Sequence, residues 1–242
     1  MAILKKIEIF FLDTLFPISC ILCQKDGFWL CKNCQEKIGF IDFQVCPVCE
    51  KYISLLGAPC VKCKPKTALT GLIAAAKYDK EDLAIIIHRF KYNFIAKLGE
   101  ELGKILLKGA SIHNLPLPDI IIPVPLHPRR LRWRGFNQAE ILSNYLSENI
   151  TPGFFIPVSK NNLIRTKYTS AQMNIKKYTE RQENIHNAFA IKNPLEIKNK
   201  TIWLIDDIST TGSTLFECAK VLKANGAKKI YALVLARQEI KK

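Results

Sequence analysis

Two adjacent carboxylates stand where an apolar strand gives way to a hydroxyl-rich segment. Asp206 and Asp207 follow the apolar run 202–205 and precede residues 208–214, which lead into an expected helix. Ligands of an open α/β sheet bind beyond the carboxyl ends of its strands, where this segment must lie. Successive backbone N–H groups, hydroxyls and a helix N-terminus bind phosphate, and a glycine lets the ligand approach the backbone closely. The residues expected to hold the phosphate are Ser209, Thr210, Thr211, Gly212, Ser213 and Thr214.

The two carboxylates need a separate role, because next to a phosphate they would repel it. A ribose cis-diol donates hydrogen bonds to carboxylates, and carboxylates attract Mg²⁺. We therefore expect Asp206 and Asp207 to be the catalytic acids, binding the sugar edge of a 5-phosphoribosyl ligand with Mg²⁺ nearby. An Asp-Asp turn with a Ser/Thr N-cap is the plainer interpretation. An acidic pair, a hydroxyl-rich loop and a glycine between a buried strand and a helix together favour the ligand site.

Eight of the nine cysteines fall before residue 64, as four Cys-x-x-Cys pairs. Two thiolates spaced in this way lie on one tight turn, and two such turns complete the tetrahedral sulfur site of structural zinc. The simplest arrangement is two zinc ribbons, one from pairs one and two and one from pairs three and four. A crossed arrangement is also compatible with the spacing. The expected zinc ligands are Cys20, Cys23, Cys31, Cys34, Cys46, Cys49, Cys60 and Cys63.

A disulfide framework is the alternative interpretation of these cysteines. It requires an oxidising compartment, and residues 1–17 show no export signal but favour a packing helix. Because about 65 residues with few large apolar side chains bury little surface, we expect zinc to supply folding free energy. Cys218 differs, because it lies at helical spacing with Leu215 and Leu222, and we expect it to be a buried core thiol.

The composition is that of an ordinary globular protein with an unusual charge. Apolar residues make up 48% of the chain, and 36 Lys and Arg against 21 Asp and Glu leave a net charge of +15. A positive surface attracts nucleic acid, anionic lipid or phosphorylated small molecules, although a Lys-rich proteome gives the same total. No run of 18 uncharged apolar residues occurs, so we expect no transmembrane segment. We expect a cytoplasmic protein, with contact to the inner face of the cytoplasmic membrane left open.

The elements that must position these residues begin near residue 70. Apolar runs predict buried strands and a 3.6-residue period predicts helices, and their alternation indicates a doubly wound parallel sheet with helices on both faces. We therefore expect a module of helix and double zinc ribbon at 1–68 and an α/β domain at 69–242. The predicted strands are 71–78, 119–124, 187–191, 200–205 and 230–235, and the predicted helices are 81–92, 94–108, 136–146 and 213–224.

The acidic loop resembles the signature for 5-phosphoribosyl 1-pyrophosphate (PRPP) of type I phosphoribosyltransferases. Two further stretches extend the resemblance: Pro123 to His127, leading into Arg-Gly-Phe-Asn-Gln at 134–138, and a later polar segment. Together with the N-terminal cysteine pairs they resemble the ComF family of competence proteins over essentially the whole chain. The residues that carry the later match are Arg165, Lys167, Thr169, Gln172, Arg181, Asn184, Ala188 and Phe189.

The resemblance implies a type I phosphoribosyltransferase-like sheet and a role for each stretch. It implies that the loop containing Val124, Pro125 and Leu126 holds pyrophosphate, and that segment 165–186 closes over PRPP. The neighbouring arginines would bind phosphate oxygens of pyrophosphate or of nucleic acid, with Trp133 and Phe136 available for base stacking. Phe136 is equally suited to be the first core residue of its helix. A solvated basic loop is the plainer alternative. The residues assigned to these contacts are Arg129, Arg130, Arg132, Arg134, Arg165 and Lys167.

Two functions follow from the resemblance. The first is a ComF-like protein that binds PRPP or ribose phosphate with Mg²⁺ and handles single-stranded DNA in natural transformation, with other DNA-uptake proteins as partners. The alternative is a phosphoribosyltransferase that transfers 5-phosphoribosyl from PRPP to a nitrogenous base in nucleotide salvage. Some purine-using relatives place a general-base carboxylate two residues before the loop glycine. Thr210 stands there in this chain, so the turnover of PRPP is left open.

Overall fold

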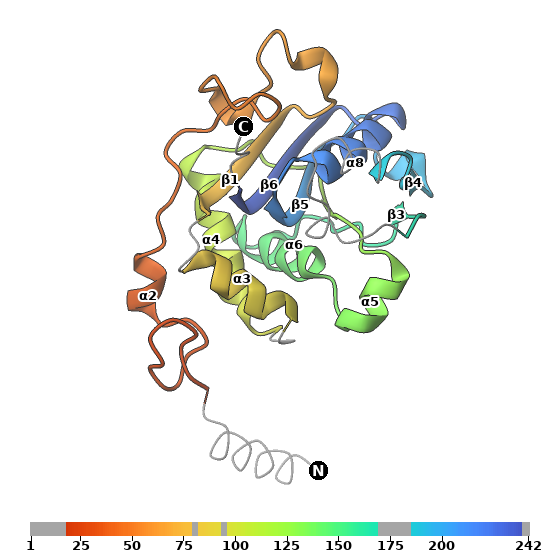
Figure 1. Cartoon of the computed structure of the whole chain (residues 1–242). Coiled ribbons are helices and arrows are strands. Elements are labelled where there is room, and N and C mark those ends of the chain that lie inside the picture. The colour runs from red at the N-terminus through yellow and green to blue at the C-terminus, as the bar shows by residue number, and fades with distance from the viewer. Residues whose placement is uncertain (1–17, 79–81, 93–95, 169–184, 239–242) are drawn as a thin grey trace.

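A four-stranded parallel sheet forms the centre of the computed structural model (Figure 1). The structure describes residues 18–78, 82–92, 96–168 and 185–238. The order of the strands is β1–β6–β5–β2, so the C-terminal strand β6 lies between β1 and β5. The strands of this sheet are β1 (Gly71–Lys77), β2 (Ile120–Pro123), β5 (Thr201–Ser209) and β6 (Lys229–Arg237).

Helices cover both faces of the sheet, as the sequence predicts (Figure 1). Successive side chains of a strand point to opposite faces, and β5 places Trp203 and Ile205 in one core and Ile202 and Leu204 in the other. Cys218 is fully buried in the second core, which confirms its prediction as a core thiol. One core lies under α3 (Leu83–Tyr92), α4 (Leu98–Ile112) and α6 (Gln138–Asn149), and the other lies under α8 (Ser213–Ala224).

Two local predictions are wrong, one in the end of a strand and one in its sheet. The strand predicted at 200–205 continues to Ser209, because β6 runs beside it and pairs with it throughout. The strand predicted at 187–191 is not part of the parallel sheet, because β4 (Phe189–Ile191) pairs antiparallel with β3 (Leu163–Arg165). The arginine-rich stretch, for which the sequence predicts no element and a solvated loop is the plainer alternative, is a helix, α5 (Pro128–Arg134).

Helix α5 forms because its ends are well capped. The side chain of His127 accepts a hydrogen bond from the backbone N–H of Arg129 (3.2 Å), and proline occupies the first helical position, where no N–H is needed. Gly135 ends the helix. The helix therefore holds its arginines at fixed positions along one short segment.

Two cysteine-rich ribbons precede the sheet and pack against it. The first ribbon, residues 18–38, contributes Leu30 and Ile38 to the core under α3 and α4. The inter-ribbon segment, residues 39–44, lies antiparallel beside β1, where the N–H of Ile41 donates to the carbonyl of Ala75 (3.1 Å). The second ribbon is residues 45–68. Short helices occur in the first ribbon at α2 (Lys32–Glu36) and in the second ribbon at η1 (Leu55–Gly57) and η2 (Lys64–Lys66). A further short helix, η4 (Pro194–Glu196), precedes β5.

Several sequence predictions lie outside the described residues. They are the N-terminal packing helix at 1–17 and most of segment 165–186, including Thr169, Gln172, Arg181 and Asn184. In the parts of the chain that the structure describes, no helix is both long enough and apolar enough to cross a bilayer.

Candidate ribose-phosphate site

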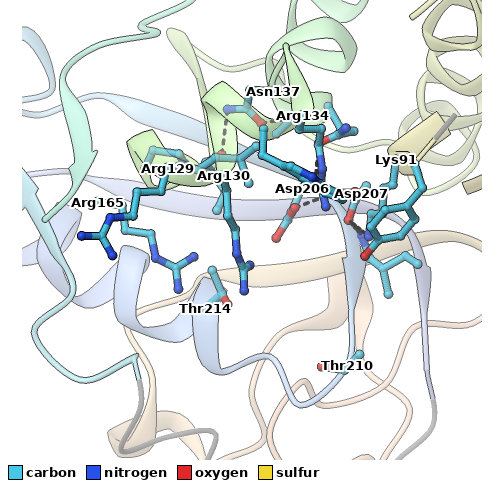
Figure 2. Close-up of a pocket in the computed structure, with 18 of the residues that line it drawn as sticks. Lys91, Arg129, Arg130, Arg134, Asn137, Arg165, Asp206, Asp207, Thr210 and Thr214 are labelled. Atoms are coloured by element: carbon cyan, nitrogen blue, oxygen red, sulfur yellow. Dashed lines mark hydrogen bonds and ion pairs between the residues drawn. The ribbon is translucent and has the colours of Figure 1, made fainter. Parts of the chain in front are cut away.

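A cavity of about 870 Å³ opens at the carboxyl edge of the central sheet (Figure 2). Residues at the ends of all four parallel strands border it: Tyr78 after β1, Val124 after β2, Ile208 near the end of β5 and Gln238 after β6. This edge is where ligands of α/β sheets bind, and the volume falls within the usual range of small-molecule sites.

The two carboxylates approach this cavity from opposite faces of β5. Asp206 pairs in register with Val234, whose side chain lies in the core under α8, whereas Asp207 points toward α3. There the Lys91 ammonium lies 2.8 Å from the Asp207 carboxylate, and the two side chains are only 17% and 9% exposed. Asp207 is therefore already paired with a cation, and Figure 2 shows the two side chains together at one end of the cavity.

Asp206 has a different electrostatic environment. Burial disfavours its charged form, and the neighbouring Asp207 adds to this effect, so that together they raise the pKa of Asp206 to about 7. Lys91 and Arg165 act in the opposite direction and limit the rise. The two carboxylates thus present less negative charge to the cavity than their number suggests.

The hydroxyl-rich segment contributes two side chains to the cavity wall, Thr210 and Thr214. The hydroxyls of Thr211 and Ser213 are buried and lie 2.7 Å apart, within hydrogen-bond distance of each other. Gly212 adopts a φ of +78° at the N-cap of α8, and a Cβ there would lie 2.8 Å from the Phe216 ring. The glycine therefore permits the turn that brings the N-terminus of α8 to the cavity.

Four of the predicted basic residues border the cavity, and two do not. Arg129, Arg130 and Arg165 lie together on one side of it (Figure 2). Arg134 also lines it. Arg132 is exposed on α5 outside the cavity wall. The ammonium group of Lys167 instead donates to the carbonyl of His186 (3.3 Å).

These arginines repel one another. Burial lowers the pKa of Arg130, and the nearby charge of Arg134 lowers it further. Burial and the charge of Arg130 likewise lower the pKa of Arg165. Like charges gathered in this way are costly without an anion between them, so the arrangement suits a ligand with several negative charges.

Arg134 and Gln138 carry polar atoms that point to a ligand. Both side chains are buried, and an Arg134 guanidinium N–H donates to Oε1 of Gln138 (2.8 Å). Nε of Arg134 and Nε2 of Gln138 have no hydrogen-bond partner among the described residues. Buried donors of this kind normally have partners, so a bound molecule is the natural acceptor. The Arg-Gly-Phe-Asn-Gln stretch was the sequence signal for this pair.

Other lining residues escaped the sequence analysis. Lys91 and Tyr92 come from α3, and nothing in the sequence separates them from other residues of an amphipathic helix. Asn137 belongs to the Arg-Gly-Phe-Asn-Gln stretch, but its role was not predicted: its amide donates to the carbonyl of Val124 (3.1 Å) and its Oδ1 caps α6, so it is a positioning residue.

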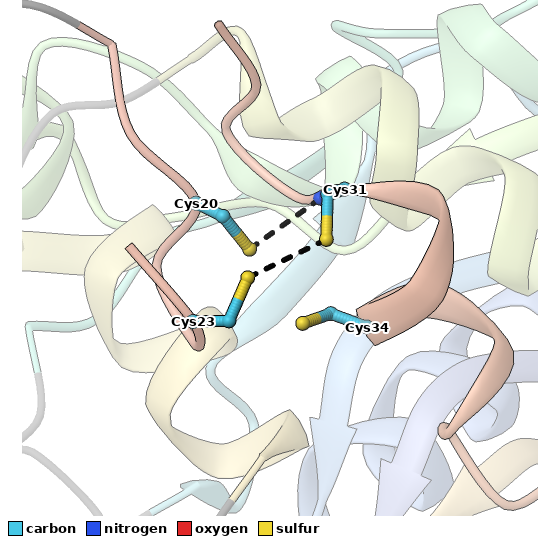
Figure 3. Close-up of side chains that lie close together, drawn as sticks. All are labelled: Cys20, Cys23, Cys31 and Cys34. Atoms are coloured by element: carbon cyan, nitrogen blue, oxygen red, sulfur yellow. Dashed lines mark hydrogen bonds between the residues drawn. The ribbon is translucent and has the colours of Figure 1, made fainter. Parts of the chain in front are cut away.

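The cysteines form two separate clusters, each made of sequential pairs rather than crossed ones. Within each cluster the four sulfur atoms lie within 4.8 Å of one another. Figure 3 shows the first cluster. Sγ of Cys23 lies 3.6 Å from Sγ of Cys31, and Sγ of Cys49 lies 3.9 Å from Sγ of Cys60. Tetrahedral zinc with bonds of about 2.3 Å requires sulfur atoms about 3.8 Å apart. The four thiols of each cluster therefore fit one zinc ion.

Backbone hydrogen bonds to sulfur support the same fit. Burial raises the pKa of the Cys20 thiol, but hydrogen bonds from the backbone, led by the N–H of Cys31, outweigh it and lower the pKa to about 6. Cys46 follows the same pattern with the N–H groups of Cys49 and Cys60 and reaches about 6. Each cluster thus contains a sulfur poised to be the thiolate that zinc requires.

Comparisons with known proteins agree with this arrangement. The double zinc ribbon domain model matches residues 11–68, and the phosphoribosyl transferase domain model matches residues 134–242. Together with the parallel sheet, they confirm the predicted fold class. A solved purine phosphoribosyltransferase from Pyrococcus horikoshii Ot3 is 21% identical and covers 61% of this chain and 75% of that one. The TM-score between the two structures is 0.33.

Relatives match along nearly the whole chain. Competence protein F of Haemophilus influenzae is 34% identical over 236 residues, covering 92% of this chain and 98% of that protein. DNA utilization protein YhgH of Escherichia coli O157:H7 is 31% identical over 230 residues, covering 91% and 97%. Competence protein ComFC of Bacillus subtilis is 27% identical over 213 residues, covering 81% and 79%. The chain therefore belongs to the ComF family of competence proteins, in which a double zinc ribbon precedes a phosphoribosyl transferase domain.

Proposed function

We propose that the cavity binds PRPP or a related ribose phosphate together with Mg²⁺, and that the protein handles single-stranded DNA during DNA uptake. The observation that carries the first part is the convergence of three kinds of group on one cavity. Hydroxyls at the N-terminus of α8, a carboxylate pair and a group of arginines border it together. These are the groups that a phosphate, a sugar diol and a pyrophosphate require.

The charge of the cavity suits PRPP better than an uncharged sugar. Five cationic side chains border it against two carboxylates, one of which is paired with Lys91. In this arrangement the 5′-phosphate contacts Thr210 and Thr214, and the ribose hydroxyls donate to Asp206. The pyrophosphate accepts from Arg130 and from the unpartnered donors of Arg134 and Gln138. Mg²⁺ bound with the pyrophosphate would supply further neutralising charge.

The DNA part of the proposal rests on the relatives and on charge. Relatives along nearly the whole chain are named for competence and DNA utilization, and this chain carries a net charge of +15. On α5, Arg132 is exposed and does not line the cavity, whereas Trp133 lines it and is 61% exposed. Arginines next to an exposed aromatic ring provide the phosphate contacts and the base stacking that single strands use.

A phosphoribosyltransferase that acts on a nitrogenous base is the second candidate, favoured by one observation. The rings of Tyr92 and Trp133 lie 6.0 Å apart, and both border the cavity, so a flat base could stack there. Thr210 occupies the position where a loop general base would stand and cannot serve as one. Asp206, which also lines the cavity, is then the side chain that would act as general base.

Two organisational proposals accompany the function. We propose that the double zinc ribbon module spans residues 1–68 and the phosphoribosyl transferase-like domain residues 69–242, with two structural zinc ions in the module. We further propose that the protein works in the cytoplasm, near other DNA-uptake proteins, because a reducing compartment keeps thiolates available for zinc.

Calorimetric titration with PRPP and Mg²⁺ tests the ligand. We expect saturable binding, and we expect replacement of Asp206 and Asp207 by Asn to weaken it by about 1–3 kcal/mol, because charged hydrogen bonds are lost. Glu36→Gln, an exposed carboxylate of the first ribbon, is the matched control and leaves the affinity unchanged. Equal affinity of the wild type and the Asp variants would show that these carboxylates do not bind the ligand.

Fluorescence anisotropy with a labelled single-stranded oligonucleotide tests the DNA part. Phosphate contacts release counterions, so we expect affinity to fall steeply as salt rises. Arg132→Gln removes one phosphate contact, so we expect the slope of log affinity against log salt concentration to become shallower by about one. The affinity for PRPP stays unchanged. Absence of binding at low salt would end this part of the proposal and leave the phosphoribosyltransferase alternative.

A further inference from the structure

The second ribbon makes a direct, largely buried contact with the end of the central sheet. Arg237, the last residue of β6, lies 2.6 Å from Oε1 of Glu50, and its guanidinium donates to the carbonyl of Pro47 (2.5 Å). The side chains of Arg237 and Glu50 are only 9% and 18% exposed. Pro47 and Glu50 belong to the turn that presents Cys46 and Cys49, so this contact joins a cysteine turn to the sheet.

The same end of β6 adjoins the candidate ribose-phosphate site. Arg237 pairs in register with Ser209, the last residue of β5, and the N–H of Gln238 donates to the carbonyl of Ser209 (2.9 Å). Gln238 borders the cavity, and Thr210, the first residue beyond β5, borders it as well. One strand pair therefore connects the Glu50 contact with the start of the phosphate loop.

The direction of the Glu50 side chain depends on the closed cysteine turn. Glu50 has a φ of +57°, which side chains resist, and its N–H donates to the carbonyl of Cys46 (3.0 Å). Zinc held by Cys46 and Cys49 would keep this turn closed. Opening the turn would separate the Glu50 carboxylate and the Pro47 carbonyl from Arg237.

We propose that Glu50 is a positioning residue of the candidate site: through Arg237 it fixes the ends of β5 and β6, and the second ribbon thereby sets the affinity of the cavity for ribose phosphate. The identity of the ligand rests on the proposed function, but the coupling itself does not. The metal content of the second ribbon would then regulate the cavity, although the second ribbon contributes none of the described residues that line it.

Glu50→Gln and Arg237→Gln test this coupling in the full-length, zinc-loaded chain. We expect hydrogen exchange of backbone amides at 209–214 to speed up in both variants, and the affinity for ribose 5-phosphate with Mg²⁺ to fall about fivefold or more. Glu36→Gln, which removes an exposed carboxylate from the first ribbon, is the matched control and leaves both unchanged. Zinc content is measured in each variant.

The double variant separates positioning from general loss of stability. If Glu50 acts through Arg237, Glu50→Gln adds nothing to Arg237→Gln, so the two effects on affinity are not additive. If the Glu50→Gln protein has lost zinc, the coupling is tested by Arg237→Gln alone, because Arg237 lies outside the cysteine turns. Wild-type exchange rates at 209–214 and wild-type affinity in both zinc-retaining variants would overturn the proposal.

Failure of this inference is distinguishable from failure of the proposed function. If the wild type binds no ribose phosphate, the proposed function fails, while the exchange rates at 209–214 still test the coupling. If the wild type binds and Arg237→Gln changes neither measurement, only the coupling fails.

Discussion

Single side chains determine how much charge the cavity offers to a ligand. Lys91 holds the Asp207 carboxylate at 2.8 Å, and burial beside Asp207 raises the pKa of Asp206 to about 7. The acids are thus largely neutralised before any ligand arrives, whereas the arginines are held close to one another. This balance of charge is the physical basis for proposing a ligand with several negative charges.

Lys91→Met tests the role of the ion pair. It leaves the Asp207 charge buried without its counter-ion, so we expect the free energy of unfolding to fall by about 3 kcal/mol. The matched control is Lys32→Met, which breaks an exposed pair with Glu36 at 3.9 Å and costs less than about 0.5 kcal/mol. Urea unfolding of both variants measures the difference, and equal stabilities would show that Lys91 does not neutralise Asp207.

Asp206→Asn should change the pH dependence of stability. The folded state raises the pKa of Asp206 from 3.8 to about 7, so between these values the folded protein binds more protons than the unfolded chain. Stability contributed by this group therefore falls as pH rises through that range, and asparagine has no such loss.

We expect Asp206→Asn to be more stable than the wild type at about pH 8, with the difference shrinking toward about pH 4. Urea midpoints at the two pH values measure it, with Asp42→Asn as the control at an exposed position. A difference independent of pH would contradict the raised pKa.

Close packing of η1 on β1, together with hydrogen bonds from the Gln44 side chain, places the second ribbon on the sheet. At η1 the backbone of Gly57, with a φ of +62°, packs directly on β1, and a Cβ there would lie 1.9 Å from the carbonyl oxygen of Leu72. Gln44 adds hydrogen bonds from its side chain to both backbone groups of Ala74 (2.9 and 3.0 Å). Close backbone contact thus fixes the ribbon that carries Glu50.

Gly57→Ala is the sharpest test of this packing. An alanine with positive φ costs about 1–2 kcal/mol wherever it occurs. Gly153→Ala, at a φ of +81° with no atom within 4 Å of the new Cβ, should cost only that much. Gly57→Ala should cost about 1–3 kcal/mol more, because the ribbon must move off β1. Equal thermal shifts for the two variants would contradict the close approach.

At the scale of the whole molecule, two zinc ribbons and one α/β domain share their cores and hydrogen bonds. The buried Cys31 and Cys34 belong to the same core as residues of α3 and α4, and the inter-ribbon segment covers the edge of β1. Loss of a zinc site is therefore expected to disturb more than the ribbon that holds it.

Cys46→Ser should lower the zinc content from about two ions per chain to about one, because a closed structural site needs all four thiolates. Cys218→Ala, which removes a core thiol outside both clusters, should retain both ions. Elemental analysis of purified protein measures this. Two ions per chain in Cys46→Ser would refute the assignment of the second cluster.

The sequence predicted periodic elements well and three-dimensional neighbours poorly. Helix α8 was predicted at its exact residues, since its apolar face and the Asn-Gly at its end are local signals. The cysteine spacing predicted both clusters. Helix α5 was missed because its capping residue and proline resemble a loop, and Lys91 because its partner is over a hundred residues away in the chain.

The most direct test of the whole account is a crystal structure with PRPP and Mg²⁺ bound, using anomalous scattering to count zinc. We expect the 5′-phosphate against Thr210 and Thr214, the ribose beside Asp206 and the pyrophosphate against the arginines of α5, with one zinc in each cysteine cluster. A cavity filled by the protein's own side chains, or PRPP bound elsewhere, would contradict the central claim.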